Sequence, residues 1–346
     1  MKRMFRLYIP EPFAGVPVVY WFKPLPEHMN YKKELPPNFF ETEVERVSDA
    51  SQAEAIVLPN NFKDPLTPEA QAYVKEYADL GERLHKPVCV FSLGDFTDKA
   101  LFDSRVHVLR FSLYTDTASP HDISIPSLTE DNAMSGITVR PKQEKPRVSF
   151  CGMGDLPGWR SWALHFKNFG FDVRALWNSN WRARKLGIYW RQAAMRACSA
   201  STLVETLFIV RKTFSGSRRT IELDPAQARK EYLDSIINSD FVIAPKGDGN
   251  YSNRFVKTLC LGRFPVVVDT NIVLPLENVI DYSLISVRVP MNRVHETPKY
   301  IREFYDALTS EEWERRQHLA RETFEKYLRQ DSFLRYFFAK VLPELN

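Results

Sequence analysis

Residues 240–270 read DFVIAPKGDGNYSNRFVKTLCLGRFPVVVDT, and this stretch decides the fold. The apolar runs 241–245 and 264–268 are each typical of a buried strand. Between them lie a loop with two glycines, residues 246–253, and a short helix predicted over residues 254–261, which a glycine ends. The order strand, glycine loop, helix, strand predicts a right-handed βαβ unit of a parallel sheet.

The glycine loop predicts an anion site. It lies at the carboxyl end of a strand and before a helix N-terminus, where free N–H groups and partial positive charge are available. Gly247 and Gly249 let the backbone approach an anion without a clash from a Cβ atom, and Lys246 and Arg254 add charge on either side. The alternative is a tight turn with an ordinary helix cap. The Walker pattern is absent, and so is a G-x-G-x-x-G fingerprint with a ribose-binding acid.

The same residues resemble a known family. The stretch 245–276 is similar to the donor-site segment of bacterial exostosin-like glycosyltransferases, glycosyltransferase family 47. The stretches 147–152, 207–214 and 228–247 also agree with that family, and the resemblance covers residues 145–290 well but the N-terminal half only loosely. The positions that match or closely fit the motif are Gly247, Gly249, Asn250, Tyr251, Ser252, Arg254, Thr258, Leu259, Gly262, Arg263, Pro265, Val266, Asp269 and Thr270.

The resemblance implies an α/β fold of GT-B type, with two Rossmann-like domains that face a cleft and a C-terminal helical tail. It implies an acceptor-side domain over residues 1–140, a nucleotide-sugar donor domain over residues 147–298, and helices over residues 299–346 that pack back across the domains. The segment 139–146 is charged and contains two prolines, so we interpret it as the interdomain linker.

Hydrophobic patterns predict the remaining elements. In the N-terminal half, apolar strands flank an amphipathic helix with Thr67 as its N-cap and Pro68 as its first residue, which indicates a parallel sheet. There we predict strands over residues 4–9, 17–22, 53–59, 86–93 and 106–114, and the helix over residues 67–85. In the second half we predict strands over residues 148–152, 171–176, 205–210 and 283–289, and helices over residues 158–169 and 226–238.

A nucleotide-sugar transferase must neutralise the leaving diphosphate, with a metal ion or with cationic side chains and helix N-termini. The sequence has no D-x-D motif and no His/Asp cluster with ligand spacing, so we expect a metal-free site. No cofactor is expected, because the nucleotide-sugar is a substrate. The predicted donor-binding residues are Gly152, Arg160, Arg211, Lys212, Lys246, Gly247, Gly249, Asn250, Ser252, Asn253, Arg254, Lys257 and Thr258.

One departure from the family lies in the helix after the loop. The family usually has Tyr-Glu there, and that Glu is taken to hold the nucleotide ribose, whereas this sequence has Val256 and Lys257. A lysine cannot accept a hydrogen bond from ribose hydroxyls, but it suits a phosphate or a carboxylate on an acidic donor sugar. A non-catalytic nucleotide- or glycan-binding homologue therefore stays as the alternative function.

The acceptor hydroxyl must lose a proton to a base, which we expect from the N-terminal domain. Asp95 follows the predicted strand 86–93, at the carboxyl end where ligand sites gather, and is the predicted catalytic residue. A serine hydrolase is not indicated, because no G-x-S-x-G motif is present. The competing candidates for the base are Glu54, Asp122, Asp131 and His121.

A basic, tryptophan-containing stretch follows the first strand of the second half. Residues 173–204 hold no Asp or Glu, while residues 174–196 hold six Lys or Arg and three Trp. One interpretation is a solvated basic helix with tryptophans in the core. The other is a patch for a lipid-linked or anionic glycan, in peripheral contact with the inner face of a membrane. Nucleic acid binding is a third option, which no RNA or DNA motif supports.

Composition fits an ordinary globular enzyme, with 346 residues, 44% hydrophobic, 26% charged and a net charge of +4. Four widely spaced cysteines indicate buried, reduced thiols. Without a signal peptide or an apolar stretch of about 18 residues, we expect a cytoplasmic protein. Together with the family's inverting outcome, this predicts transfer of a sugar from a nucleotide-sugar donor to a glycan acceptor in surface polysaccharide or lipopolysaccharide biosynthesis.

Overall fold

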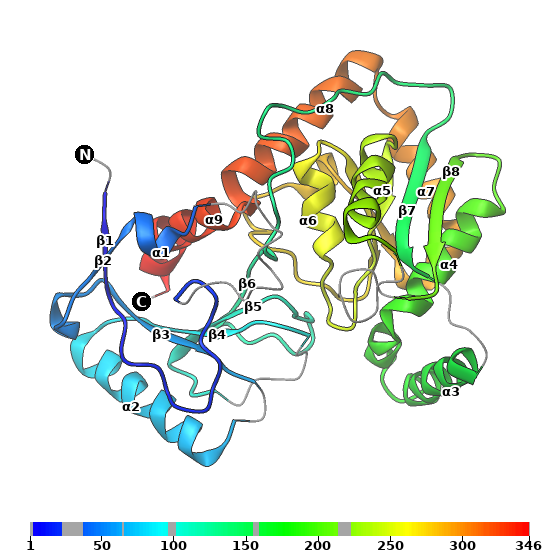
Figure 1. Cartoon of the computed structure of the whole chain (residues 1–346). Helices are drawn as coiled ribbons and strands as arrows, with labels where there is room; N and C mark the ends of the chain where they lie inside the picture. The colour runs from blue at the N-terminus through cyan, green and yellow to red at the C-terminus, as the bar shows by residue number, and fades with distance from the viewer. Residues whose placement is uncertain are drawn as a thin grey trace. The chain divides into compact units, whose positions relative to one another are not determined.

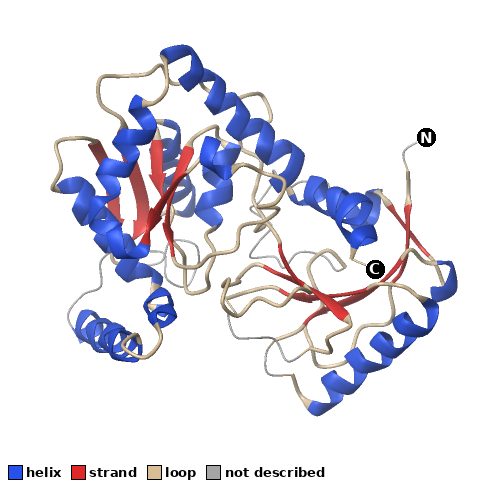
Figure 2. Cartoon of the chain, turned by 180° about the vertical axis from the view of Figure 1, so that it is seen from behind, coloured by secondary structure: helices blue, strands red, loops and turns tan. Residues whose placement is uncertain are grey.

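The chain forms two compact units, each built on one parallel β-sheet (Figures 1 and 2). Unit 1 comprises Met1–Glu130, Val273–Leu276 and Lys326–Asn346, and unit 2 comprises Asp131–Ile272 and Glu277–Glu325. The predicted α/β architecture with two parallel sheets and C-terminal helices is therefore confirmed. The computed structural model describes residues 3–22, 37–63, 66–95, 102–154, 159–213 and 223–345.

The sheet of unit 1 has the strand order β2-β1-β3-β4-β5-β6. Its strands are β1 (Phe5–Tyr8), β2 (Val44–Arg46), β3 (Ala55–Asn61), β4 (Val88–Ser92), β5 (Val106–Arg110) and β6 (Asp122–Ser124). The strands predicted near residues 4–9, 53–59, 86–93 and 106–114 are thus confirmed. The strand predicted over residues 17–22 is wrong. Val19 and Trp21 are buried in alternation as in a strand, but the backbone there closes as a turn from Phe22 N–H to the Val19 carbonyl.

Helix α2 (Pro68–Leu84) packs on this sheet, as predicted. The Thr67 side chain accepts a hydrogen bond from the Ala70 N–H and so caps the helix, which begins at Pro68. The helix buries Ala70, Val74 and Ala78 against apolar residues of β3, β4 and β5. This burial fixes the strands, and therefore fixes where their carboxyl ends lie.

The C-terminal residues complete unit 1. Helix α9 (Gln330–Tyr336) packs against α1 (Phe39–Thr42). The Phe39 and Phe338 rings stack with centroids 5.4 Å apart. Arg335 Nε donates to Glu43 Oε2 at 2.7 Å. Unit 1 therefore draws its core from both ends of the described chain.

The sheet of unit 2 has the strand order β11-β10-β9-β7-β8, and all its pairs are parallel. Its strands are β7 (Arg147–Met153), β8 (Glu205–Arg211), β9 (Phe241–Ile243), β10 (Phe264–Asp269) and β11 (Val287–Pro290). Its helices are α3 (Trp159–Arg174), α4 (Gly187–Ser199), α5 (Pro225–Ile237), α6 (Asn253–Cys260), α7 (Thr297–Asp306) and α8 (Ser310–Thr323). The βαβ unit predicted from the opening stretch is confirmed, since β9 and β10 pair in parallel across α6.

Helices cover both faces of this sheet (Figure 2). Phe241 and Ile243 face a core shared with α4, α7 and α8, whereas Val242 between them packs with residues of α5 and with Leu261. This alternation explains the continuous apolar run of β9, because a strand buried on both faces has no polar side. Residues 139–143 also pack into unit 2, where the Arg140 carbonyl accepts a hydrogen bond from Trp313 Nε1 at 3.0 Å.

The strand predicted over residues 171–176 is wrong, because those residues continue and then end helix α3. The large apolar side chains at 162, 166, 169 and 173 follow helical spacing, and this spacing continues into the segment 171–176 for which a strand is predicted.

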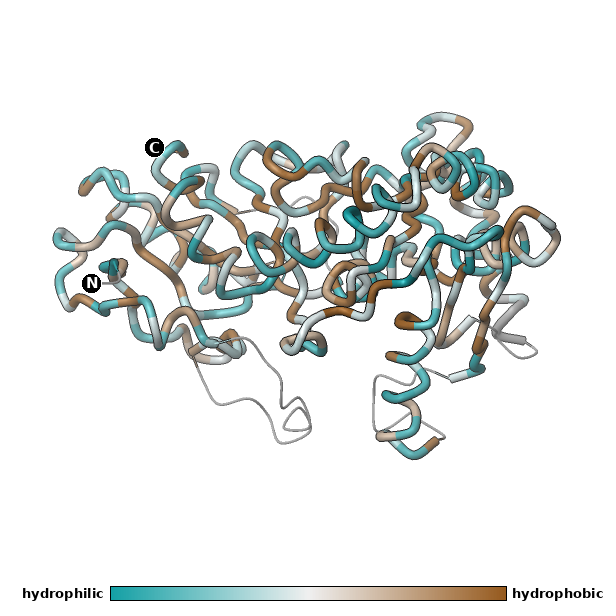
Figure 3. Tube along the Cα trace, turned by 90° about the horizontal axis from the view of Figure 1, so that it is seen from above, coloured by the Kyte–Doolittle hydropathy of each residue, from teal (hydrophilic) through white to brown (hydrophobic). Residues whose placement is uncertain are grey.

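The four cysteines are free and buried, as predicted. Within the described ranges, no helix has the length and apolar character needed to cross a bilayer. Figure 3 shows that hydrophobic and hydrophilic residues are interspersed along the chain.

Candidate functional site

The strand order of unit 2 reverses at one point, and we use the word crevice for the edge of the sheet at that point, where the carboxyl ends of β7 and β9 lie. The order β11-β10-β9-β7-β8 reverses between β9 and β7, because the chain leaves β7 for β8 on one side and returns to β9 on the other. Ligands of open parallel sheets bind outside the carboxyl ends of the strands at such a reversal. At this point β7 ends at Met153 and β9 leads into the glycine loop 246–253.

The glycine loop is held in place from several sides. The Gly247 N–H donates to the Tyr251 carbonyl at 2.8 Å, and the buried Asn250 side chain exchanges hydrogen bonds with Thr270 at 2.7 and 3.2 Å. Gly187, the first residue of α4, lies directly against the loop, since a Cβ atom there would be 2.2 Å from the Lys246 carbonyl oxygen. Only glycine therefore lets the N-terminus of α4 approach the loop this closely.

Two helices thus begin beside the loop. Helix α6 follows it directly, and α4 packs on it through Gly187. Neither N-cap residue, Ser252 for α6 or Leu186 for α4, caps its helix with a side-chain hydrogen bond. The first N–H groups of both helices therefore contribute partial positive charge at the crevice.

Two half-buried arginines converge at the end of β7, Arg254 from α6 and Arg191 from α4. Arg254 Nη2 donates to the Cys151 carbonyl at 2.8 Å, and Arg191 Nη1 donates to the Met153 carbonyl. Both guanidinium groups lie over the Phe150 ring, 4.2 Å and 5.6 Å from its centroid. Gly152, with φ 143°, leaves Arg254 this room, since a Cβ atom there would be 3.1 Å from Arg254 Nη2.

Neither arginine has an ion-pair partner among the described residues, and Asp248 is only a smaller, opposing influence on the pKa of Arg191. Burial, and then the neighbouring Arg254, lower the pKa of Arg191 to about 10, and burial also lowers the pKa of Arg254. The Nε atoms of Arg191 and Arg254 are buried without a hydrogen-bond partner among the described residues. A bound anion would accept from these donors and offset the repulsion between the two groups.

The other predicted cations differ in their surroundings. Lys246 is buried, and this burial, followed by repulsion from Arg184, lowers its pKa to about 7. Arg211 at the end of β8 pairs with Glu231, Nη2 to Oε2, at 2.6 Å, and Lys212 beside it is exposed. Arg160 begins α3, and its side chain lies outside the described residues.

Lys257 and Thr258 both make contacts within the fold. Lys257 is buried on α6, and its Nζ donates to the Asn132 side chain. The Thr258 hydroxyl donates to the Arg254 carbonyl of the same helix at 2.7 Å. Of the remaining predicted donor-binding residues, Gly249 is buried, Ser252 is half-buried and Asn253 is exposed.

The strand order of unit 1 reverses in the same way between β1 and β3, and the corresponding edge of its sheet is the crevice of unit 1. The loop after β1 is tied down by Asn60, whose side chain bonds the Phe13 N–H at 2.9 Å and the carbonyls of Phe13 and Val16. This loop carries an exposed carboxylate, Glu11, which the sequence analysis missed. Its signal is the strand order, because a carboxylate directly after β1 lies at the reversal.

Asp95, the predicted base, lies exposed after β4, one strand beyond that reversal. Three of the competing acids are engaged in ion pairs: Glu54 pairs with Arg3, Asp122 with Arg110 at 3.2 Å, and Asp131 with Arg321 at 2.7 Å. The His121 ring lies 5.4 Å from the ring of His107. Within the described part of the chain, no group of three or more His, Cys, Asp or Glu is placed to hold a metal ion.

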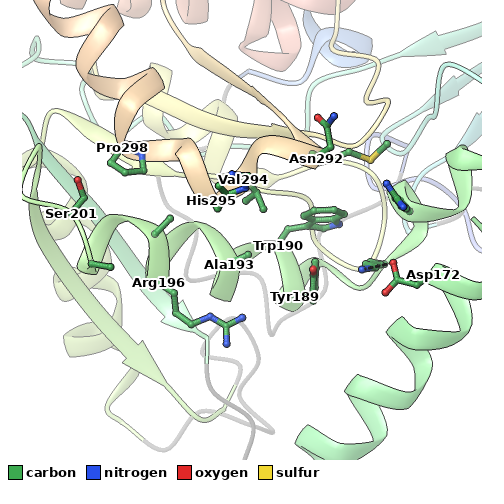
Figure 4. A pocket seen from close by; sticks show the side chains of 15 residues that line it. Asp172, Tyr189, Trp190, Ala193, Arg196, Ser201, Asn292, Val294, His295 and Pro298 are labelled. Atoms are coloured by element: carbon green, nitrogen blue, oxygen red, sulfur yellow. Dashed lines mark ion pairs between the residues drawn. The ribbon is translucent and has the colours of Figure 1, made fainter.

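A pocket of 890 Å³ lies on another side of α4, between this helix, the 3-10 helix η5 (Met291–Glu296) and the start of α7 (Figure 4). Trp190 is buried in its wall, and its Nε1 has no hydrogen-bond partner among the described residues. The cations Arg182, Lys185 and Arg196 line it as well, and Lys185 pairs with Asp172 at 2.7 Å. None of the predicted donor-binding residues lines this pocket, so it is separate from the predicted site.

Residues 190–304 match the family model of the Exostosin GT47 domain. The matched range contains the glycine loop, Arg191, Arg254 and the strands β8 to β11. The family resemblance seen in the sequence is confirmed by this match.

Solved glycosyltransferase structures are similar at low identity. A glycosyltransferase from Rickettsia africae ESF-5 is 10% identical over 100% of this chain and 99% of that chain, with a TM-score of 0.36. The lipopolysaccharide outer core galactosyltransferase WaaB in its apo form is 10% identical over 98% and 100%, with a TM-score of 0.39. Anabaena HepE in complex with UDP-glucose is 9% identical over 99% and 100%, with a TM-score of 0.34.

Proposed function

From the Exostosin GT47 domain at residues 190–304, we propose that this protein is an inverting glycosyltransferase that uses a nucleotide-sugar donor and a glycan acceptor. The observation that carries the proposal is the half-buried pair Arg191 and Arg254 at the crevice between β7 and β9. The unpaired Nε groups of this pair, the two helix N-termini and the glycine loop supply the donors and positive charge that a diphosphate needs. The transferred group in this proposal is a hexosyl or related sugar, and the pathway is surface polysaccharide or lipopolysaccharide biosynthesis.

In the proposed reaction, the acceptor hydroxyl attacks the anomeric carbon from the face opposite the diphosphate. A base takes the hydroxyl proton as the new C–O bond forms, and the bond to the diphosphate breaks with its electron pair on the leaving oxygen. Arg191, Arg254 and Lys246 stabilise the charge that develops there, because fixed cations in a buried site need little reorganisation. The site is proposed to work with these side chains and without a metal ion.

Two carboxylates compete for the role of base. Asp95 is the proposed base, because it follows a strand of unit 1 at the carboxyl end of the sheet. Glu11 is the second candidate, because its loop lies at the reversal of strand order. Both are exposed, so either can reach an incoming acceptor without a change in the core.

The acceptor in this proposal is a glycan or a lipid-linked glycan, and nucleic acid is not a partner. Peripheral contact with the inner face of a membrane is proposed through the basic stretch 174–196, where Arg174, Arg182 and Arg196 are exposed. Cations of this kind attract anionic headgroups and would hold the enzyme near a lipid-linked acceptor.

The proposal is tested by a thermal-shift screen with UDP-, GDP-, dTDP- and CMP-sugars in the absence of metal. We expect one class of donor to stabilise the protein, by about 3 kcal/mol at a concentration of 100 times Kd. Arg254→Ala and Arg191→Met should reduce this shift by about half or more, while Arg315→Ala, a change at an exposed arginine of α8, should keep it. No shift with any donor argues against the transferase. A shift without sugar transfer to any glycan supports the non-catalytic alternative.

A further inference from the structure

The exposed hydrophobic side chains of this protein gather in one place. More than half of the large hydrophobic residues that are exposed in the described chain fall within residues 162–181. Six of them form one row, which we call the α3 row. Its members, with their exposed fractions, are Trp162 (71%), Phe166 (69%), Phe169 (66%), Val173 (36%), Leu176 (78%) and Trp177 (80%).

The first four members of the α3 row lie on one face of helix α3, because they follow the spacing of four and three residues that places side chains on one side of a helix. Leu176 and Trp177 lie in the turn that follows the helix. On the other face Leu164 is buried, the Asn168 side chain accepts a hydrogen bond from the Leu186 N–H at 3.1 Å, and Asp172 pairs with Lys185. These contacts attach the opposite face of α3 to the rest of unit 2 and leave the side chains of the row exposed. Figure 1 shows helix α3 at the edge of the unit.

Exposed cations lie on α3 itself and on the 3-10 helix η3 (Ser179–Arg184) and α4, which line one pocket together with α3. Lys167, Arg174, Arg182 and Arg196 are exposed, and the last two also line the pocket of Figure 4. The single acidic residue from 159 to 200 is Asp172, which is paired with Lys185. The region therefore combines an apolar face rich in aromatic side chains with a rim of cations.

We infer that the α3 row is a docking surface for a bilayer that contains anionic lipids. Tryptophan, phenylalanine and leucine side chains enter the headgroup and upper acyl region, and the cations of the rim meet negatively charged headgroups. A second copy of this chain fits less well, because a two-fold contact through this face would bring the two cationic rims together. The inference deepens the membrane contact proposed above by naming the inserting element, and it does not depend on donor binding.

The test is sedimentation with vesicles of phosphatidylcholine containing about 30% phosphatidylglycerol, compared with pure phosphatidylcholine. We expect binding to the anionic vesicles and quenching of tryptophan emission by brominated lipids. The variant Trp162→Ser/Phe166→Ser/Trp177→Ser should bind at least about 10-fold more weakly. Lys167→Glu/Arg174→Glu should also weaken binding by about 10-fold, and added salt should have a similar effect. The matched control, Leu203→Ser/Leu223→Ser, removes exposed leucines elsewhere in unit 2 and should bind normally.

Several outcomes would overturn the inference. They are absence of binding to the anionic vesicles, equal binding to phosphatidylcholine alone, and full binding by the serine variant. A dimer in solution that the serine variant converts to a monomer would assign the surface to a second copy instead. The donor-induced thermal shift should persist in the serine variant, which separates a failure at the membrane surface from a failure of the proposed donor site.

Discussion

Unit 1 and unit 2 have the same strand order at the centre of their sheets, and their crevices differ in charge. The order β2-β1-β3-β4 of unit 1 corresponds to the order β8-β7-β9-β10 of unit 2, and each reverses at its central pair. The crevice of unit 1 has a loop tied by Asn60 and the exposed acid Glu11. The crevice of unit 2 has the buried Lys246 and the half-buried Arg191 and Arg254. The fold therefore provides two crevices, and the side chains decide which of them suits an anion.

The largest expected effect is on the rate of sugar transfer, and it tests whether unit 1 supplies the base while unit 2 binds the donor. Asp95→Asn should lower the rate of sugar transfer by about 100-fold or more, since it removes the proposed base, and should leave the donor Kd unchanged. Single-turnover transfer and calorimetric donor binding measure the two quantities. Glu11→Gln is the matched control. If Glu11→Gln loses the activity and Asp95→Asn keeps it, the base lies at the reversal of unit 1. If both variants transfer sugar at the native rate, the proposal that unit 1 supplies the base is wrong.

A second comparison lies within unit 2, between Arg254, which we propose binds the donor, and Arg263, which stabilises the fold. Arg263 is buried and donates to the carbonyls of Ile237 and Thr138 and to the Gln317 side chain at 2.6 to 3.0 Å. Arg263→Ala should lower the free energy of unfolding by about 3 kcal/mol, because it strands these acceptors, and leave the donor Kd unchanged.

Arg254→Ala should do the reverse. Donor binding should weaken by about 10- to 100-fold, and stability should change little, because the loss of one hydrogen bond is offset by relief of repulsion with Arg191. Denaturant unfolding and calorimetry measure both variants. An Arg254→Ala protein as unstable as Arg263→Ala would make Arg254 a structural residue.

His107 of unit 1 should make the free energy of unfolding depend on pH in the acidic range. Burial, and then His121, lower the pKa of His107 on β5 from 6.5 to about 4. The unfolded state therefore binds more protons than the folded state between these values, so the free energy of unfolding should fall as pH falls from 6.5 to about 4, by up to about 3 kcal/mol. His107→Gln should flatten this part of the profile, and the exposed His295→Gln should not. An unchanged profile in His107→Gln would contradict the assignment.

The smallest expected effect concerns the crevice of unit 2. Burial, followed by repulsion from Arg184, lowers the pKa of Lys246 to about 7, and a bound diphosphate would raise it again. Binding then takes up a proton, so donor affinity should fall by about 10-fold as pH rises from about 6 to about 9. Lys246→Met should remove this dependence. Lys257→Met, a change at a lysine bonded to Asn132, should retain it. A pH-independent affinity in the native protein would place the diphosphate away from Lys246.

Local patterns predicted the elements around the glycine loop, because apolar runs, glycines and caps mark them within a few residues. For residues 171–176 the pattern predicts the wrong element, because a short apolar run fits a strand as well as the end of a helix. Arg254 was predicted from the motif next to the loop, but Arg191 was missed. It lies far from the loop in sequence, and only the packing of Gly187 on the loop brings α4 to the crevice. Glu11 becomes a candidate only when the strand order is known, because no local sequence pattern shows that β1 lies at the reversal.

Unit 1 is built from separate segments of the chain, which has a consequence for its folding during synthesis on the ribosome. Chains emerge N-terminus first, and domains usually fold as they emerge. All of unit 2 has been made by Glu325, yet the contacts of Phe39 with Phe338 and of Glu43 with Arg335 require residues made later. The unit that begins first is therefore finished last. A chain stalled or truncated before Lys326 would hold a complete second sheet while Phe39 lacks its stacking partner, an apolar target for chaperones and proteases until synthesis ends.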